Sequence, residues 1–161
     1  MIDLDTYSGG HMSEANKTVV RRWFEEVWNQ GREAAVDELF AAGAVAHGLG
    51  DSELDVHGPA EFKPFVAGIR GSIPDVHFQV EDILSEGDRV AVRILLRGTH
   101  TGPGLGVAPT GGRVSIRGII IVRVLNGQIV EGWNCYDQLG LLRQVGAIPG
   151  PGDRDSFLTA S

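Results

Sequence analysis

The strongest constraint in this sequence is an alternation of apolar and polar residues that begins at residue 77 and ends at residue 136. Such a two-residue period is typical of strands that bury one face. Two connections carry hairpin signals, Ser85–Asp88 and Asn126-Gly127, and an Asn-Gly pair is the strongest short hairpin signal. We therefore predict an antiparallel meander of long, twisted strands over residues 77–84, 89–100, 113–125 and 128–136.

Helical periodicity precedes this sheet. Ser13 is a predicted helix N-cap, and residues 15–30 carry one apolar stripe with helical spacing. A second helix is predicted over residues 32–42, and a third begins at Pro59, because proline favours the first turn of a helix. After the last strand, Asp137 is a predicted N-cap for a final short helix.

Helices followed by an antiparallel meander indicate an α+β fold rather than a parallel α/β fold. We expect the N-terminal helices to pack on one face of a curled antiparallel sheet, giving a cone with an internal apolar cavity. Residues 43–58 are expected to form mostly loop, with a short strand at residues 45–47.

The length of 161 residues predicts one domain. We interpret residues 1–11 as a vector-derived extension, residues 12–148 as the domain and residues 149–161 as a flexible tail. The net charge of −7 argues against nucleic acid or an anionic membrane as the main partner. The sequence has no secretory signal and one cysteine, so we expect a reducing cytoplasmic location.

Several kinds of chemistry lack their motifs. The glycine-rich segment Gly102–Gly112 contains no lysine and precedes a strand, so it does not fit a phosphate-binding loop. It is interpreted either as a mobile flap over the cavity or as a plain hairpin loop. No histidine pair has the spacing of a helical metal site, and no serine lies in a nucleophile elbow. Cys135 is expected to be a small packed apolar residue. We therefore expect neither a metal nor an organic cofactor.

The last strand and helix carry a recognisable pattern, Gly-x-Ile-x-x-x-Trp-x-x-x-Asp-x-x-Gly-Leu-Leu-x-Gln-x-Gly, over residues 127–146. Together with Trp28–Gly31, Asp37–Phe40, Gly98–Gly102 and Pro109–Gly111, it resembles the SnoaL-like polyketide cyclase family. This resemblance covers most of residues 15–146. It implies the cone-shaped α+β fold of the nuclear-transport-factor-like superfamily and ring closure by intramolecular aldol condensation without metal or cofactor.

The resemblance also locates the positions where the family carries its acid and base. The position of the family's carboxylate, directly after the tryptophan of the last strand, is Asn134 here, and the position of its helper histidine is Ile120. An asparagine side chain forms hydrogen bonds but does not accept a proton near neutral pH. The aldol mechanism and the related epoxide hydrolysis therefore both lack their base, unless Asp137, Asp82 or His100 replaces it.

The candidate catalytic residues are Asn134, Asp137 and His100. For Asp137 the alternative is a purely structural role as N-cap, and for His100 it is a hydrogen bond to a loop. The candidate substrate-binding residues are mostly apolar or aromatic and are expected to line the cavity: Phe24, Trp28, His47, Phe65, Ile120, Val122, Trp133 and Tyr136.

Four functional hypotheses follow. The first is a cofactor-independent cyclase that shapes a hydrophobic polyketide-type substrate for ring closure, including a pericyclic closure of the Diels–Alder type. The others are an aldol cyclase with a relocated base, a hydroxylase component of a two-component oxygenase, and a non-catalytic binding module. Ile119, Ile120 and Ile121 make both faces of one strand apolar, so we also expect a homodimer.

Overall fold

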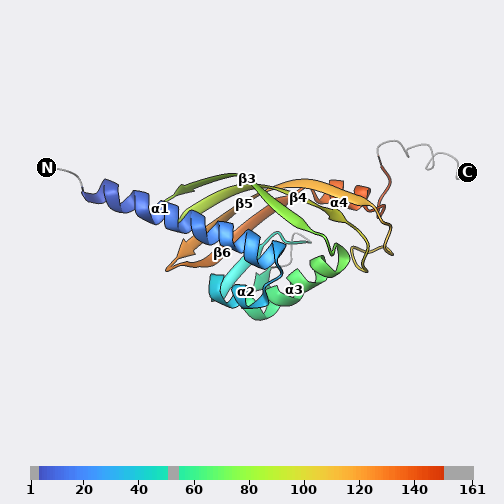
Figure 1. Ribbon diagram of the computed structural model, residues 1–161, viewed down its shortest axis with the longest axis horizontal. Coiled ribbons are helices and arrows are strands. Elements are labelled where there is room, and N and C mark those ends of the chain that lie inside the picture. Colours follow the sequence, from blue (N-terminus) through green and yellow to red (C-terminus); the bar gives the residue numbers. More distant parts are fainter. Residues whose placement is uncertain (1–3, 51–54, 151–161) are drawn as a thin grey trace, which may run out of the picture.

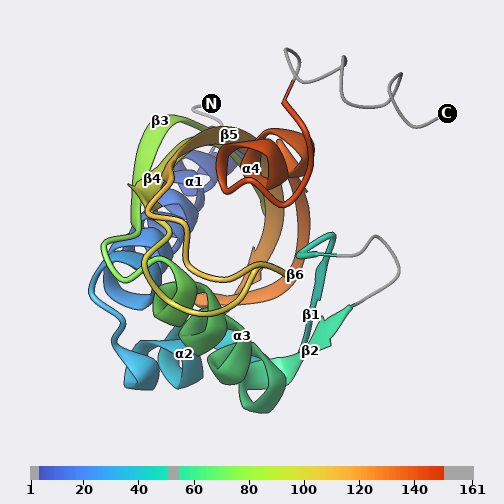
Figure 2. The ribbon, with the colours of Figure 1, turned by 90° about the vertical axis from the view of Figure 1, so that its right-hand side faces the viewer.

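The computed structural model describes residues 4–50 and 55–150. Figure 1 shows helices lying along one side of a long twisted sheet, and Figure 2 shows that sheet curling, with helices across its open side. The strand order is β2-β1-β6-β5-β4-β3. The α+β fold class is confirmed.

The four predicted strands of the meander are confirmed with nearly the expected bounds: β3 (His77–Glu86), β4 (Arg89–Thr99), β5 (Arg113–Leu125) and β6 (Gln128–Tyr136). All three pairings within this meander are antiparallel. Asn126 and Gly127 both have positive φ, 51° and 76°, as the favoured two-residue hairpin turn requires.

The sheet is mixed rather than purely antiparallel. The expected short strand at residues 45–47 is confirmed, but it begins earlier, in residues expected to be helix end and loop, and forms β1 (Phe40–His47), which pairs with β6 in parallel. Residues expected to be loop also form β2 (Val56–His57), which pairs with β1. The predicted helix over 32–42 is therefore wrong beyond Leu39. Its α-helix, α2 (Glu33–Leu39), ends where parallel pairing begins. The partner residues on β6 are 86–89 positions away in the sequence, so they leave no local sequence signal.

The first helix also differs from its prediction. The α-helix α1 (Leu4–Arg22) begins before Ser13, and the Ser13 hydroxyl contacts the hydroxyl of Ser85 instead of capping the helix. The helix then continues as a π-helix, η1 (Trp23–Asn29). The wider turn of a π-helix accompanies burial of four large apolar side chains: Trp23, Phe24, Val27 and Trp28.

The remaining helices agree with their predicted capping signals. Pro59 lies in the first turn of α3 (Gly58–Ser72). Asp137 is the N-cap of α4 (Gln138–Gln144), and its Oδ1 accepts a hydrogen bond from Gly140 N at 2.8 Å. Residues 151–161 of the expected tail lie outside the described residues. No helix in the described part of the chain has both the length and the hydropathy to cross a membrane.

An aromatic cluster joins the helices to the concave face of the sheet. The ring of Trp28 lies 4.8 Å from Phe78, 6.0 Å from Phe62 and 6.1 Å from Phe65, between ring centroids. Each such pair contributes about 0.5–1.5 kcal/mol beyond its buried area. These contacts hold Trp28, a residue of η1, against α3 and β3.

Two polar contacts secure the same joint. The Asn29 side chain accepts a hydrogen bond from Phe78 N at 2.8 Å and donates one to Phe78 O at 3.0 Å. The Arg70 guanidinium donates to the carbonyls of Trp28 and Asn29 at 2.5 and 3.0 Å. Gly31 has φ 67°, and a Cβ there would lie 2.6 Å from Arg70 Nε. Glycine is therefore favoured at this position because it adopts the positive φ of the turn and leaves space for the Arg70 guanidinium.

We predict that Asn29→Ala lowers the free energy of unfolding by about 2–3 kcal/mol, because both backbone groups of Phe78 lose a partner. Urea unfolding followed by circular dichroism measures this change. Asn16→Ala is the matched control, since Asn16 makes one exposed 3.4 Å contact, and it should change stability by less than about 0.5 kcal/mol. Equal effects of the two variants would contradict the stabilising role assigned to the Asn29 side chain.

Candidate active site

The main cavity lies between the helices and the concave face of the sheet and has a volume of about 560 Å³. This volume falls in the usual range for small-molecule sites, about 300–1,000 Å³. Aliphatic and aromatic side chains make up most of its lining, and its side-chain hydrogen-bonding groups are few. The apolar lining includes Trp28, Leu49, Phe65, Ile69, Phe78, Leu96, Leu105, Ile116, Leu141 and Leu142.

A second, narrow chamber adjoins the first and has a volume of about 20 Å³, enough for a group the size of one water molecule. The two chambers share Trp28, Leu49, Asn134 and Tyr136. These shared residues form the junction between a wide outer cavity and a small inner one. The inner walls include Val20, Trp23, Phe24, Phe40, Phe62, Ile120, Val122 and Ile129.

Asn134 is held at this junction by two hydrogen bonds. Its Nδ2 donates to the carbonyl of His47 at 2.7 Å, and its Oδ1 accepts from the Tyr136 hydroxyl at 3.1 Å. Because a backbone carbonyl only accepts, the contact with His47 fixes which end of the amide faces β1. One N–H of Asn134 remains to donate to a ligand.

Close packing of backbones supports the same residue. Gly48 follows β1 with φ 72°, and a Cβ there would lie 2.3 Å from the backbone oxygen of Asn134. Any larger residue would push the end of β1 away from β6. The hydrogen bond between Asn134 and His47 therefore depends on a glycine at position 48.

The lining carries no carboxylate and no histidine among the residues that the structure describes. Burial raises the pKa of the Tyr136 phenol above its ordinary value, so the hydroxyl stays neutral across the physiological range. The amide of Asn134 does not titrate. The described cavity thus offers hydrogen bonds and shape, but neither a carboxylate nor an imidazole to act as a base.

The structure brings most of the predicted substrate-binding residues to the cavity. Asn134, the first candidate catalytic residue, lies at the junction. Among the substrate-binding candidates, Phe65 lines the outer chamber. The inner chamber is lined by Phe24, Ile120 and Val122. Trp28 and Tyr136 lie at the junction.

Two predicted substrate-binding residues lie outside the cavity. Trp133 points to the convex face of the sheet with 38% of its surface exposed, because alternate residues of β6 face opposite sides. His47 stacks on Trp133 with ring centroids 5.7 Å apart. Neither residue lines either chamber, so their placement in the cavity was wrong.

The carboxylates proposed as replacement bases also lie elsewhere. Asp137 is exposed and caps α4, as its structural alternative predicted. Asp82 is exposed because a register shift between Val80 and Asp82 turns it to the convex face.

The expected packing of Cys135 was wrong, because Cys135 is exposed.

His100 is fully buried but lines neither chamber. Its Nδ1 lies 3.3 Å from Thr110 Oγ1, while its backbone bonds to Gly111 and Gly112. It therefore joins the two ends of the Gly102–Gly112 loop, which fits its hydrogen-bonding alternative rather than a catalytic role. The same loop contributes Leu105 and Gly106 to the outer cavity.

Several lining residues were not predicted from the sequence, among them Leu49, Phe78, Leu96, Ile116 and Leu141. Phe78, Leu96 and Ile116 occupy inward positions of predicted strands, so the alternation contained a signal for them. Leu49 follows β1, whose extent was missed. Its position could not be inferred without the parallel pairing of β1 and β6.

On the convex face, His47 forms a charged clamp. Its Nδ1 lies 2.8 Å from Asp55 Oδ1 and its Nε2 lies 3.1 Å from Glu131 Oε1. These hydrogen bonds, that to Asp55 first, raise the pKa of His47 above its ordinary value. Only the imidazolium form donates at both nitrogens.

We predict that this clamp makes stability depend on pH. Because the folded pKa is raised, the contribution of His47 is complete below about pH 6.5 and is lost as the pH rises through the folded pKa. His47→Gln should lower the melting temperature at about pH 5.5 and change it little at about pH 9. Thermal unfolding across this range is the measurement, with His57→Gln on the neighbouring strand as control. An equal loss at both pH values would refute the charged clamp.

Comparisons with known proteins agree with this geometry. The SnoaL-like polyketide cyclase family matches residues 18–145. The aklanonic acid methyl ester cyclase DnrD of Streptomyces peucetius is 27% identical over 129 residues, which cover 80% of this chain and 88% of the relative.

Two solved structures extend the likeness. A protein of Jannaschia sp. CCS1 described as a candidate SnoaL-like polyketide cyclase superimposes with a TM-score of 0.77 at 28% identity, covering 85% of this chain and 95% of its own. IdmH of Streptomyces antibioticus, described as a candidate polyketide cyclase, has a TM-score of 0.69 at 31% identity, covering 81% and 98%. The chain therefore belongs to the SnoaL-like polyketide cyclase family.

Proposed function

We propose that this protein is a cofactor-independent cyclase that folds a hydrophobic polyketide-type intermediate in its cavity and promotes ring closure mainly by shape. The observation that carries this proposal is the lining: a cavity of about 560 Å³ with an anchored amide and no carboxylate or histidine among the described residues. Membership of a polyketide cyclase family and the name of DnrD support the substrate class.

The cavity supplies orientation. Holding two reacting ends of a flexible chain in contact supplies up to about 7–11 kcal/mol of the barrier without any acid or base. In a pericyclic closure, existing π electrons become the new C–C bonds and no proton moves. Such a reaction suits a lining without a carboxylate or a histidine among the described residues, whereas an aldol closure requires a base to remove a proton from carbon.

Asn134 supplies polarisation. Its remaining N–H can donate to a substrate carbonyl, which lowers the electron density of the adjacent double bond. The Tyr136 hydroxyl, by donating to Asn134 Oδ1, strengthens the amide as a donor through cooperative polarisation. A substrate with its carbonyl at the junction then places its chain in the wide outer cavity.

We predict that turnover is flat between about pH 5 and 9 and that Asn134→Ala lowers kcat by less than about 100-fold. The measurement is a pH–rate profile on linear polyketide and polyene substrates, with a separate arm containing a flavin reductase. The matched variant is Asn134→Asp. In this variant the new carboxylate would face the carbonyl of His47, and both groups are hydrogen-bond acceptors. The pH–rate profile of the variant should therefore show the titration of this carboxyl group.

A sigmoidal or bell-shaped profile for the unaltered protein would contradict closure by shape and favour an aldol mechanism. Turnover only with the flavin reductase would favour the oxygenase alternative. Ile120→Trp fills the inner chamber and should lower kcat/KM. Leu84→Trp, on the exposed edge strand β3, should leave it unchanged.

We also propose that the protein is a homodimer through its convex face. Four exposed apolar side chains lie near one another on β5 and β6: Ile119, Ile121, Leu125 and Trp133, with 56, 41, 42 and 38% exposure. Ile121 and Trp133 are direct cross-strand partners. A second copy of the same self-complementary patch would cover this surface.

The dimer has its own test. Ile119→Asp with Ile121→Asp should convert the dimer to a monomer in light scattering at micromolar concentration, because two carboxylates per chain would be buried against each other. Leu84→Asp is the control, since Leu84 is 65% exposed on the edge strand β3, and it should remain dimeric. A monomeric unaltered protein would refute the proposal.

A further inference from the structure

A second hollow lies on the sheet away from the cavity, where β3 and β5 begin and β4 ends. Its volume is about 450 Å³, and it shares no residue with either chamber of the cavity. Its lining differs from theirs in being polar and basic, and consists of Asp75, His77, Arg97, Gly98, Thr99, Arg113, Val114 and Ser115.

The register of the sheet places the two arginines close together. Arg97 pairs with Ser115 and with His77, while Arg113 pairs with Thr99 two residues further along, on the same face of the sheet. Arg97 and Arg113 are therefore diagonal neighbours on adjacent strands, about 7–8 Å apart between Cα atoms, which is within reach of long side chains. Two guanidinium groups can converge on one ligand from this arrangement.

Neither arginine forms an ion pair in the described part of the chain, although the chain is acidic overall. Arg113 has no ion pair or hydrogen bond within residues 4–50 and 55–150, and the contact of Arg97 is a 3.5 Å approach to the amide oxygen of Gln79. The next arginines on the same strands differ. Arg93 and Arg117 both reach Glu81, at 2.5 and 3.5 Å.

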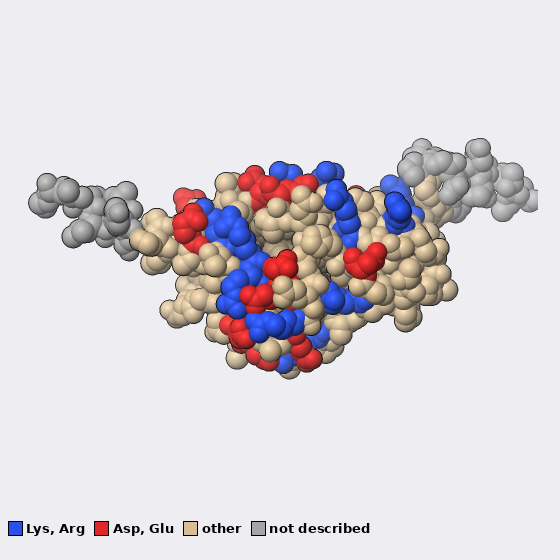
Figure 3. Space-filling view, viewed as in Figure 1, with Lys and Arg blue, Asp and Glu red and all other residues tan. Residues whose placement is uncertain are grey.

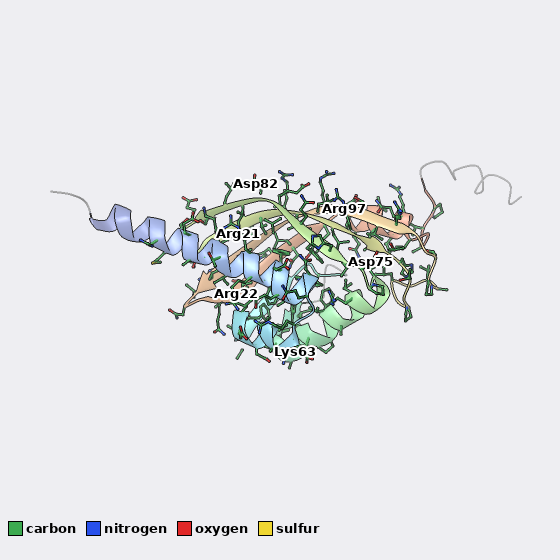
Figure 4. All side chains as sticks on the ribbon, viewed as in Figure 1. Arg21, Arg22, Lys63, Asp75, Asp82 and Arg97 are labelled. Carbon is green, nitrogen blue, oxygen red and sulfur yellow. The ribbon has the colours of Figure 1, made fainter. Side chains whose placement is uncertain are left out.

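The one carboxylate in the hollow is already engaged. Asp75 Oδ1 accepts from Thr99 N at 2.7 Å and its Oδ2 accepts from Thr99 Oγ1 at 2.9 Å. These hydrogen bonds, the backbone one first, lower the pKa of Asp75 and keep it charged. Figure 4 shows Asp75 and Arg97 toward the same end of the sheet, and Figure 3 shows that basic and acidic side chains elsewhere on this side are interspersed. Asp75 secures Thr99 and forms no ion pair with either arginine.

Ser115 adds a positioned hydroxyl. The side-chain amide of Gln144 accepts from Ser115 N at 2.7 Å and donates to Ser115 O at 3.1 Å, so α4 continues the hydrogen-bonding ladder where β6 has ended. This contact holds the Ser115 backbone in place. Its hydroxyl has no partner in the described part of the chain.

We propose that this hollow binds a phosphate group of a small molecule, with the guanidinium groups of Arg97 and Arg113 and the hydroxyl of Ser115 as donors. The fixed fork of a guanidinium matches two phosphate oxygens, and charge-assisted hydrogen bonds of this kind are the strong ones. With two guanidinium groups and one carboxylate, the hollow carries a net positive charge, which favours an anion. The site is independent of the cavity and of the reaction proposed for it.

The site also lies at the base of the Gly102–Gly112 loop. Thr99 and Arg113 flank the Gly102–Gly112 loop, whose Leu105 and Gly106 line the outer cavity. A phosphate group bound between β4 and β5 bridges the two strands from which this loop departs.

The test is isothermal titration calorimetry with orthophosphate, glycerol 2-phosphate and pyrophosphate in a low-salt buffer. We expect saturable 1:1 binding with a dissociation constant of about 1 mM or tighter, weakened by added salt. Similar affinities for orthophosphate and its ester indicate recognition of the phosphate group itself. Much tighter binding of pyrophosphate indicates that a diphosphate compound is the ligand.

Arg97→Gln with Arg113→Gln should weaken binding by about tenfold or more, the effect of removing hydrogen bonds to a charged group. The matched control is Arg89→Gln, because Arg89 lies on the same strand, is exposed and forms no ion pair in the described structure. It should change affinity by less than about twofold, as expected for a distant surface charge. Lysine at both positions 97 and 113 keeps the charge but loses the fork, and should give an intermediate affinity.

Three outcomes would overturn the proposal: no saturable binding by the unaltered protein, unchanged affinity in the double variant, or an equal loss in Arg89→Gln. Arginine Nε–Hε signals in NMR spectra provide a readout that does not depend on folding of the variants. Phosphate should shift the signals of Arg97 and Arg113 and leave that of Arg89 in place.

Discussion

The joint between η1 and β3 determines the geometry of the whole interior. Asn29 bonds to both backbone groups of Phe78, and Arg70 binds the two carbonyls at the end of η1. Between these contacts stands Trp28, which lines both chambers of the cavity. Loss of the joint would free the indole ring and merge or close the chambers, so the shape of the site depends on contacts that no ligand touches.

A similar dependence holds on the opposite wall. Asn134 is oriented by the carbonyl of His47, and the approach of these strands requires the absence of a side chain at Gly48. The imidazole of the same His47 holds Asp55 and Glu131 on the convex face. The amide inside and the charged clamp outside therefore share one backbone position. A preorganised donor of this kind loses little free energy to reorganisation when a substrate arrives.

The sequence was most informative where structure is local. The bounds of β5 and β6 and the turn at Asn126-Gly127 follow from alternation and turn chemistry, which act over a few residues. The failures involve distant partners. Strand β1 exists because β6 offers it a parallel edge, and the bulge in β3 reverses the facing of Asp82. His47 was misplaced for the first of these reasons. Trp133 was misplaced although the alternation of β6 opposes it to Asn134.

Charge and catalysis are separated in this fold. No described carboxylate, histidine or cation lines either chamber, while the cavity retains one amide and one neutral phenol as its anchored polar pair. A hydrogen bond in such an apolar interior is stronger than one in water, so a single N–H has more effect on a carbonyl there than on the surface. The same interior would penalise an unpaired carboxylate and raise its pKa. Under the proposed function, asparagine in place of an acid would therefore let the cavity polarise a substrate without the cost of a buried charge.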